Sequence, residues 1–137
     1  MEREGVFDPE TLAAAREAYE SVGPAAQTAV RETATAMDFD REEYEDRVTS
    51  DVVETARDAI FASLLVVRVG DRDEFESWRE DAAVEVTVLG SPDVERVVWH
   101  VAPFADGAVA ATFQAERDAA VATLRRQAFG RLYRDRL

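Results

Sequence analysis

Apolar residues in the first part of the chain recur with a helical period. One set, spaced three or four residues apart, marks the inner face of a first helix: Leu12, Ala15, Tyr19 and Val22. Asp8-Pro9 predicts the start of this helix, with Asp8 as the N-cap, and Gly23-Pro24 predicts its end. A second helix is expected from Pro24, and its predicted inner face consists of Ala26, Val30, Thr33 and Met37.

Acidic capping sequences predict the next two helices. Asp40 is followed three residues later by Glu43, which is the spacing of a capping box. A short helix is therefore expected after Asp40. Asp51 and Glu54 repeat the same spacing, and they predict a further helix that continues through residue 62.

The pattern changes to a β-type after residue 63. Residues 64–69 are rich in Leu and Val and end at Gly70, which favours a strand, although continued helical spacing leaves open a longer preceding helix. Asp71 and Glu74 form another capping box, which predicts a short helix. Three more strands are predicted, at residues 84–89, 96–102 and 108–113, and a long helix follows at residues 114–134.

This order of elements predicts the fold class. Helices come first, strands occupy the middle, and a long helix ends the chain, which is typical of an α+β fold with a small, mostly antiparallel sheet. The length of 137 residues fits a single domain over residues 1–137.

The composition excludes several kinds of chemistry. The chain has no cysteine and a single histidine, so disulfides, thiolate metal sites and a cysteine nucleophile are excluded. It also lacks a glycine-rich phosphate loop and a Gly-x-Ser-x-Gly elbow. We therefore expect no metal and no other cofactor. These absences favour a non-enzymatic domain that acts through protein–protein contact, as a homo-oligomer or with another protein partner.

The charge points to the solvent in which the protein works. The net charge is −13, all 16 basic residues are arginine, and lysine is absent. Such an excess of carboxylates without lysine is typical of proteins that fold in concentrated salt. The N-terminus has no basic segment followed by an apolar core, and no apolar run approaches the roughly 18 residues of a membrane span. The sequence therefore predicts a halophilic, cytoplasmic protein that does not bind membranes.

One strand end is a candidate pocket. Trp99, His100 and Phe104 lie on either side of Pro103, which ends the strand of residues 96–102. A catalytic histidine needs a nucleophile or an orienting carboxylate within reach, and no sequence pattern supplies one. We therefore expect His100 to be a structural histidine that bonds to the backbone or to water. A small-ligand binder or hydrolase that uses Trp99, His100 and Phe104 is an alternative.

The last helix is the only basic part of the chain. Residues 117–137 carry six arginines and two aspartates, a net charge of +4, whereas residues 1–116 carry ten arginines and 27 acidic residues, a net charge of −17. The predicted buried stripe of this helix is Val121, Leu124, Ala128 and Leu132. At about 100° per residue from the start of this segment, Arg125, Arg126 and Arg134 fall at about 80°, 180° and 260°. These three arginines are the candidate partner surface.

A nucleic-acid-associated regulator that uses these arginines is the alternative. A helix that enters a nucleic-acid groove would concentrate its arginines on one side. The calculated spread around the helix makes nucleic acid the less favoured partner.

Several segments resemble a known family. They are GPAAQT (23–28), MDFDRE (37–42), RDAIFASLL (57–65), Trp99-His100 with Pro103-Phe104, and AAVATLRRQAFGR (119–131). Together they resemble a small family of acidic proteins of unknown function that is confined to haloarchaea. The resemblance covers nearly the whole chain and implies a haloarchaeal cytoplasm. It brings no known activity, cofactor or catalytic residue.

The charge generates a first prediction. We expect the purified protein to be folded in molar KCl and to lose cooperative structure near 0.1 M salt, because the Debye length rises from about 3 Å at 1 M to about 10 Å at 0.1 M. The self-repulsion of a net charge of −13 is then no longer screened. A salt titration followed by circular dichroism measures this change. An unchanged spectrum and melting temperature at 0.1 M would contradict the halophilic interpretation.

Overall fold

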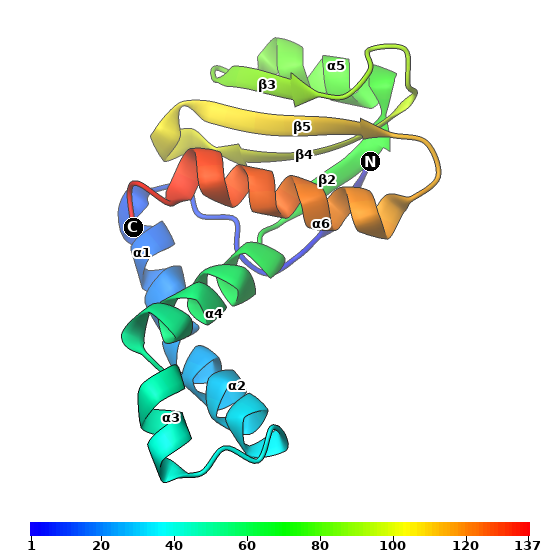
Figure 1. Cartoon of the computed structure of the whole chain (residues 1–137). Helices are drawn as coiled ribbons and strands as arrows, with labels where there is room; N and C mark the ends of the chain where they lie inside the picture. The colour runs from blue at the N-terminus through cyan, green and yellow to red at the C-terminus, as the bar shows by residue number, and fades with distance from the viewer.

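The strands form a five-stranded sheet between α5 and α6 in the computed structural model, which describes residues 1–137 (Figure 1). The strands are β1 (Glu2–Glu4), β2 (Val67–Asp71), β3 (Glu85–Leu89), β4 (Arg96–Ala102) and β5 (Gly107–Phe113). Their order across the sheet is β1-β2-β4-β5-β3. β3 pairs with β5 in parallel and the other pairs are antiparallel, so the sheet is mixed but mostly antiparallel, as predicted.

Helices precede, interrupt and follow the sheet. They are α1 (Leu12–Ser21), α2 (Gly23–Ala36), α3 (Arg41–Arg47), α4 (Ser50–Ser63), α5 (Arg72–Asp81) and α6 (Arg117–Ala128), and α6 continues into a π-helix at Phe129–Tyr133. The predicted α+β class with a long C-terminal helix is confirmed. α4 ends at Ser63 and β2 begins at Val67, so the alternative of one helix through residue 69 is wrong.

Two predicted N-caps are wrong, because threonines take both positions. Thr11 caps α1, and Asp8 instead binds Arg3 with 2.6 Å between the guanidinium and carboxylate. Thr49 caps α4, so Asp51 falls inside the first turn. In that position a carboxylate still interacts favourably with the helix dipole. Which residue caps each helix depends on the path of the preceding chain, and the local sequence does not determine that path.

The two other predicted N-caps, Asp40 and Asp71, are present in the structure. The predicted inner face of α2, in contrast, differs from the buried one. Asp40 caps α3, and Asp71 forms a complete capping box at the start of α5. In α2 the buried residues are Ala26 and Ala34, whereas Met37 lies beyond the helix end and is 58% exposed. The small alanines allow α2 to lie close along α4. The contact therefore buries fewer residues of α2 than the predicted inner face contains.

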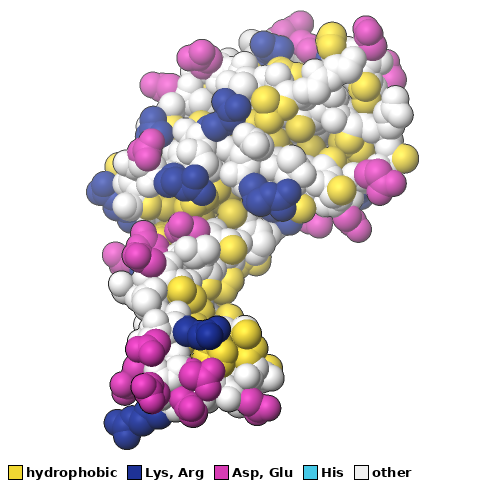
Figure 2. All heavy atoms as spheres, viewed as in Figure 1, with side chains coloured by type: hydrophobic (Ala, Val, Ile, Leu, Met, Phe, Trp, Pro, Cys, Tyr) yellow, Lys and Arg dark blue, Asp and Glu magenta, His cyan; other side chains and the backbone are white.

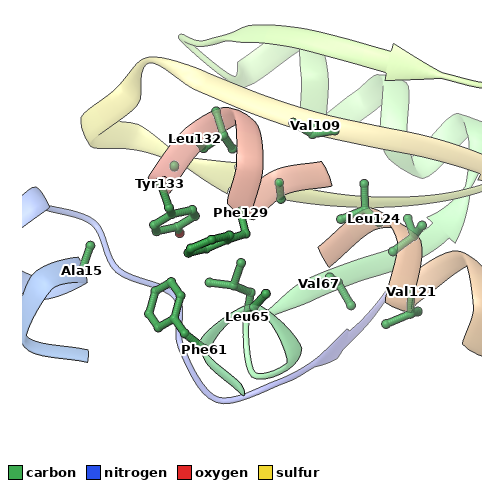
Figure 3. Packing of buried hydrophobic residues seen from close by; sticks show 14 of the residues in the cluster. Ala15, Phe61, Leu65, Val67, Val109, Val121, Leu124, Phe129, Leu132 and Tyr133 are labelled. Carbon is green, nitrogen blue, oxygen red and sulfur yellow. The ribbon is translucent and has the colours of Figure 1, made fainter. Parts of the chain in front are cut away.

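The main core lies between one face of the sheet and the helices α1, α4 and α6. The predicted stripe of α6 is buried there: Val121, Leu124, Ala128 and Leu132. Phe61 of α4 is fully buried, and four aromatic rings have their centroids 5.4–5.8 Å from its own: Phe7, Tyr19, Phe129 and Tyr133. Figure 3 shows this ring beneath the C-terminal residues. α1, α4 and the C-terminal helix therefore meet around one side chain.

α2, α3 and the first half of α4 extend away from this core as an arm, which comprises residues 23–56 (Figure 1). Within the arm only Ala26 and Ala34 are buried, and no residue of α3 is. The arm carries nine acidic residues and three arginines, a net charge of −6. Figure 2 shows acidic side chains gathered around its far end. The arm is thus an acidic projection with almost no core of its own.

His100 of β4 connects three parts of the structure inside the core. It is fully buried, and its Nδ1 lies 2.6 Å from the carbonyl oxygen of Val66, while its Nε2 lies 2.6 Å from the hydroxyl of Tyr133. A carbonyl oxygen only accepts, so Nδ1–H donates to Val66. In the neutral imidazole, Nε2 then accepts a hydrogen bond from Tyr133. These bonds join the chain after α4, the sheet and the π-helix.

Burial also determines the charge state of this pair. Burial lowers the pKa of His100 below its ordinary value of 6.5, because the imidazolium would lose its hydration. Burial raises the pKa of Tyr133, so its hydroxyl keeps its proton. Both shifts favour the neutral, hydrogen-bonded arrangement.

The His100 site generates a second prediction. The stability that depends on neutral His100 is fully present above pH 6.5 and is lost as the pH falls, because the unfolded chain then binds a proton that the folded chain does not. The slope contributed by one such group is at most about 1.4 kcal/mol per pH unit. His100 is the only histidine, so His100→Gln should remove this slope. Urea unfolding at a series of pH values and constant KCl measures it.

Tyr133→Phe is the control variant. It deletes only the hydroxyl, so it should lower the free energy of unfolding by about 1–3 kcal/mol through the unpaired Nε2. It retains the histidine and should therefore retain the pH slope. Equal pH dependence of wild type and His100→Gln would contradict the neutral, buried histidine.

Candidate functional site

A groove with a volume of about 740 Å³ lies between α4 and α6. Figure 1 shows these two helices side by side and running in opposite directions, at the root of the arm. The floor of the groove is apolar and consists of Ala59, Ala62, Val121, Ala122 and Phe129. The small alanines leave the space that larger side chains would fill.

All three arginines of the predicted partner surface line this groove: Arg125, Arg126 and Arg134. Figure 2 shows arginine side chains along the edge of the body that faces the arm. The structure therefore brings together residues that a regular α-helix would spread around its circumference. Their surroundings nevertheless differ, so they are not equivalent as binding groups.

Arg125 is a structural residue of the groove wall. Its Nε donates to the carbonyl oxygen of Leu65 at 2.9 Å, and one Nη donates to the carbonyl oxygen of Glu4 at 3.2 Å. These two bonds fix the chain after α4 and the end of β1 against α6. Two of the five N–H groups of Arg125 are thus committed to backbone carbonyls, which holds its side chain in place.

Arg126 and Arg134 are exposed and carry charges that no carboxylate neutralises. Arg126 donates only a 3.3 Å bond to Thr123 of its own helix. The guanidinium of Arg134 lies over the ring of Phe129, 5.4 Å from its centroid. Arg126 and Arg134 therefore offer guanidinium N–H groups beside an apolar floor, and it is this position, not the lack of an ion pair, that distinguishes them from the other unpaired arginines of the chain.

The π-helix places Arg134 at the groove. The N–H of Arg134 donates to the carbonyl oxygen of Phe129, five residues earlier, at 3.0 Å. A turn closed by such bonds contains more residues than an α-turn, so each residue advances through a smaller angle. Arg134 therefore falls short of its α-helical position at about 260° and lies nearer to that of Arg126 at about 180°. The predicted spread of the arginines is corrected by this change of helix type.

Two of the acidic residues that line the groove, Asp58 and Glu4, have a hydrogen-bond or ion-pair partner within the chain. Asp58 of α4 accepts a 2.6 Å hydrogen bond from the hydroxyl of Tyr19, and burial together with this bond raises the pKa of Tyr19 to about 12. Glu4 pairs with Arg117 at 3.3 Å. Asp118 lies in the first turn of α6, at the opposite end of the helix from Arg126. Glu4, Asp58 and Asp118 therefore keep their negative charges in the lining, but none of them lies within ion-pair distance of Arg126 or Arg134.

The other predicted site residues do not form a common pocket. Trp99 points to the face of the sheet covered by α5, where it packs against Phe75 and Trp78. His100 points to the opposite face and is sealed in the core. Phe104 is half-buried beside Tyr133, with 5.5 Å between the ring centroids. None of the predicted three lines the α4–α6 groove or either of the two next cavities.

Sequence reasoning missed the α4 wall of the groove. The sequence predicted this helix but assigned no role to Thr55, Asp58 or Ala59, all of which line the cavity. The only available signal was the run of small residues on this side of the helix, which leaves room beside it. That signal is too common in an alanine-rich chain to identify a groove.

Two other kinds of feature are absent from the structure. No group of three or more His, Cys, Asp or Glu side chains is arranged to hold a metal ion. No helix combines the length and the apolar character that are needed to cross a bilayer.

Comparison with known protein families gives a match over most of the chain. Residues 6–134 match a family of unknown function (DUF5809), and this match covers well over half of the chain. No curated protein and no solved structure matches the chain significantly. The family match confirms the part of the resemblance that concerned a family without known activity. The chain belongs to this family of unknown function, DUF5809.

Proposed function

We propose that the protein is a non-enzymatic binding module, and that its α4–α6 groove accepts an acidic, partly apolar segment of a partner protein. The observation that carries this proposal is the pair Arg126 and Arg134, which line an apolar-floored groove without any carboxylate partner. Arginine is well suited to this role, because its planar fork binds carboxylates through two parallel hydrogen bonds.

The charge distribution supports an acidic occupant. The chain as a whole carries −13, and the C-terminal segment is its only basic region. An acidic segment is repelled by most of the surface and attracted to the groove, which favours one docking position over others. Contacts that are partly desolvated in a groove are also screened less by salt than fully exposed ion pairs are.

The shape and the floor of the groove support a protein segment. An amphipathic helix binds between two helices by placing apolar side chains on the floor and polar ones along the rim. Ala59, Ala62 and Phe129 supply such a floor, and the arginines stand at its edge. Nucleic acid is the less favoured occupant, because phosphate contacts weaken steeply in concentrated salt, whereas apolar burial on the groove floor does not.

The acidic composition belongs to the same proposal. An acidic surface without lysine suits a halophilic protein of a salt-rich cytoplasm, such as that of haloarchaea. In that solvent long-range attraction is weak, so a partner has to be held by short-range contacts and by the burial of apolar surface. A groove with an apolar floor provides both.

A third prediction tests the groove. The probe is a fluorescein-labelled peptide with leucine at positions i, i+3, i+4 and i+7 and glutamate elsewhere, titrated in the lowest KCl concentration that keeps the native circular dichroism spectrum. We expect Arg126→Glu/Arg134→Glu to raise the Kd of this peptide by about tenfold or more, because attraction is replaced by repulsion. Fluorescence anisotropy measures the Kd.

The matched control is Arg79→Glu/Arg96→Glu. It makes the same change in net charge at two exposed arginines, and Arg96 lies over Phe113 at 5.3 Å much as Arg134 lies over Phe129. Its peptide affinity should stay close to that of wild type. Equal losses in both variants would contradict the groove, and tighter binding of double-stranded DNA than of the peptide would favour the nucleic-acid alternative.

A further inference from the structure

α3 is a helix without a partner in its own chain. All seven of its residues, Arg41–Arg47, are exposed, and the Tyr44 side chain is 38% exposed. A helix this short is marginal in water unless packing supports it. Its polar side chains are mostly carboxylates: Glu42, Glu43, Glu45 and Asp46. α3 thus combines an exposed aromatic ring with surrounding negative charge.

The arm around α3 has a second uncovered surface. A hollow of about 310 Å³ lies between α2, α3 and α4, and most of its lining is apolar, including Val30, Phe39 and Val48. Two more of its lining residues, Met37 and Val52, are 58% and 42% exposed. Figure 2 shows apolar surface on the arm beside its acidic side chains. Contiguous apolar surface of this kind marks an interaction site.

The chemistry of α3 is complementary to that of the groove. In a helix, residues adjacent in sequence point about 100° apart, so Glu43 and Glu45 flank Tyr44 on either side. A tyrosine directed at an apolar floor therefore has a carboxylate on either side of it, while Arg41 and Arg47, three residues away in each direction, reduce the net charge of α3 to −2. The groove offers the matching set, with the ring of Phe129 on the floor and Arg126 and Arg134 at the edge.

We propose that the occupant of the groove is α3 of a second copy of this chain, in a reciprocal dimer. This inference rests on the proposed function of the α4–α6 groove and names its partner. Tyr44 of each copy lies on the apolar floor of the other, and the carboxylates of Glu43 and Glu45 bind Arg126 and Arg134. The arm is the element that each protomer extends to the other.

The architecture allows both contacts to form together. α4 spans the arm, with its N-terminal end next to α3 and its C-terminal half in the groove wall. Two copies placed antiparallel along their arms therefore bring each α3 to the groove of the other copy. A two-fold axis between the arms makes the contacts identical, so the assembly closes as a dimer and does not extend into a filament. The same arrangement brings the two uncovered apolar surfaces of the arms together.

A fourth prediction follows, and it uses exchange of charge. We expect wild-type protein to sediment as a dimer in the lowest KCl concentration that keeps the native spectrum. The groove variant Arg126→Glu/Arg134→Glu and the arm variant Glu43→Arg/Glu45→Arg should each raise the dimer Kd by about tenfold or more, because each places like charges in both contacts. Sedimentation equilibrium measures the Kd, and circular dichroism verifies that both variants are folded.

An equimolar mixture of the two variants is the decisive sample. In their heterodimer one contact is wild type, and the other pairs a glutamate groove with an arginine arm, so both contacts are attractive. The mixture should therefore recover a dimer that neither variant forms alone. Arg79→Glu/Arg96→Glu and Glu80→Arg/Asp81→Arg, which change exposed charges elsewhere on the body, should remain dimers.

The outcomes separate this inference from the function on which it rests. A monomeric wild type that still binds the leucine–glutamate peptide through Arg126 and Arg134 overturns the dimer and leaves the groove as a binding site. A dimer that is unaffected by the groove and arm variants also overturns the inference. Failure of the mixture to dimerise, with both variants folded, does the same. Weakened dimerisation in both the groove and the arm variant, together with loss of peptide binding in the groove variant, supports both.

Discussion

The structure depends on the packing of aromatic rings around Phe61. This one side chain of α4 contacts rings from the N-terminal segment, from α1 and from the π-helix. One of those rings, Tyr133, also donates a hydrogen bond to His100 of the central sheet. The root of the arm, the C-terminal helix and the sheet are therefore fixed to each other at one point. A side chain lost from this cluster would loosen all three at once, because each contact relies on the others for its geometry.

The same packing explains why the groove carries its charges. Ala128, Phe129, Leu132 and Tyr133 at the end of the chain are all buried. The π-helix widens the turn so that these residues face the core together. The following residue, Arg134, then lies over Phe129 at the edge of the groove. π-turns of this kind are frequent at functional sites, and here the turn joins core packing to the position of a binding group.

The charge pattern divides the molecule into complementary regions. The arm carries a net charge of −6, and the segment of residues 117–137 carries +4. The two regions meet at α4, whose first half belongs to the arm and whose second half forms the groove wall. Within one chain the arm extends away from the groove (Figure 1), so its carboxylates form no ion pair with Arg126 or Arg134, and the one ion pair within the arm joins Arg41 to Glu45. This separation is the physical reason to look for the partner of each region outside the protomer.

The sequence by itself determined the class of fold, most element positions and the buried stripe of α6, because periodicity and capping chemistry are local properties. It also identified Arg125, Arg126 and Arg134 as the candidate partner surface. Only the tertiary structure decided that they share a groove, since their convergence depends on a π-helix and on an α4 wall distant in sequence. The threonine caps and the burial of His100 were likewise decided by long-range packing, which no window of neighbouring residues records.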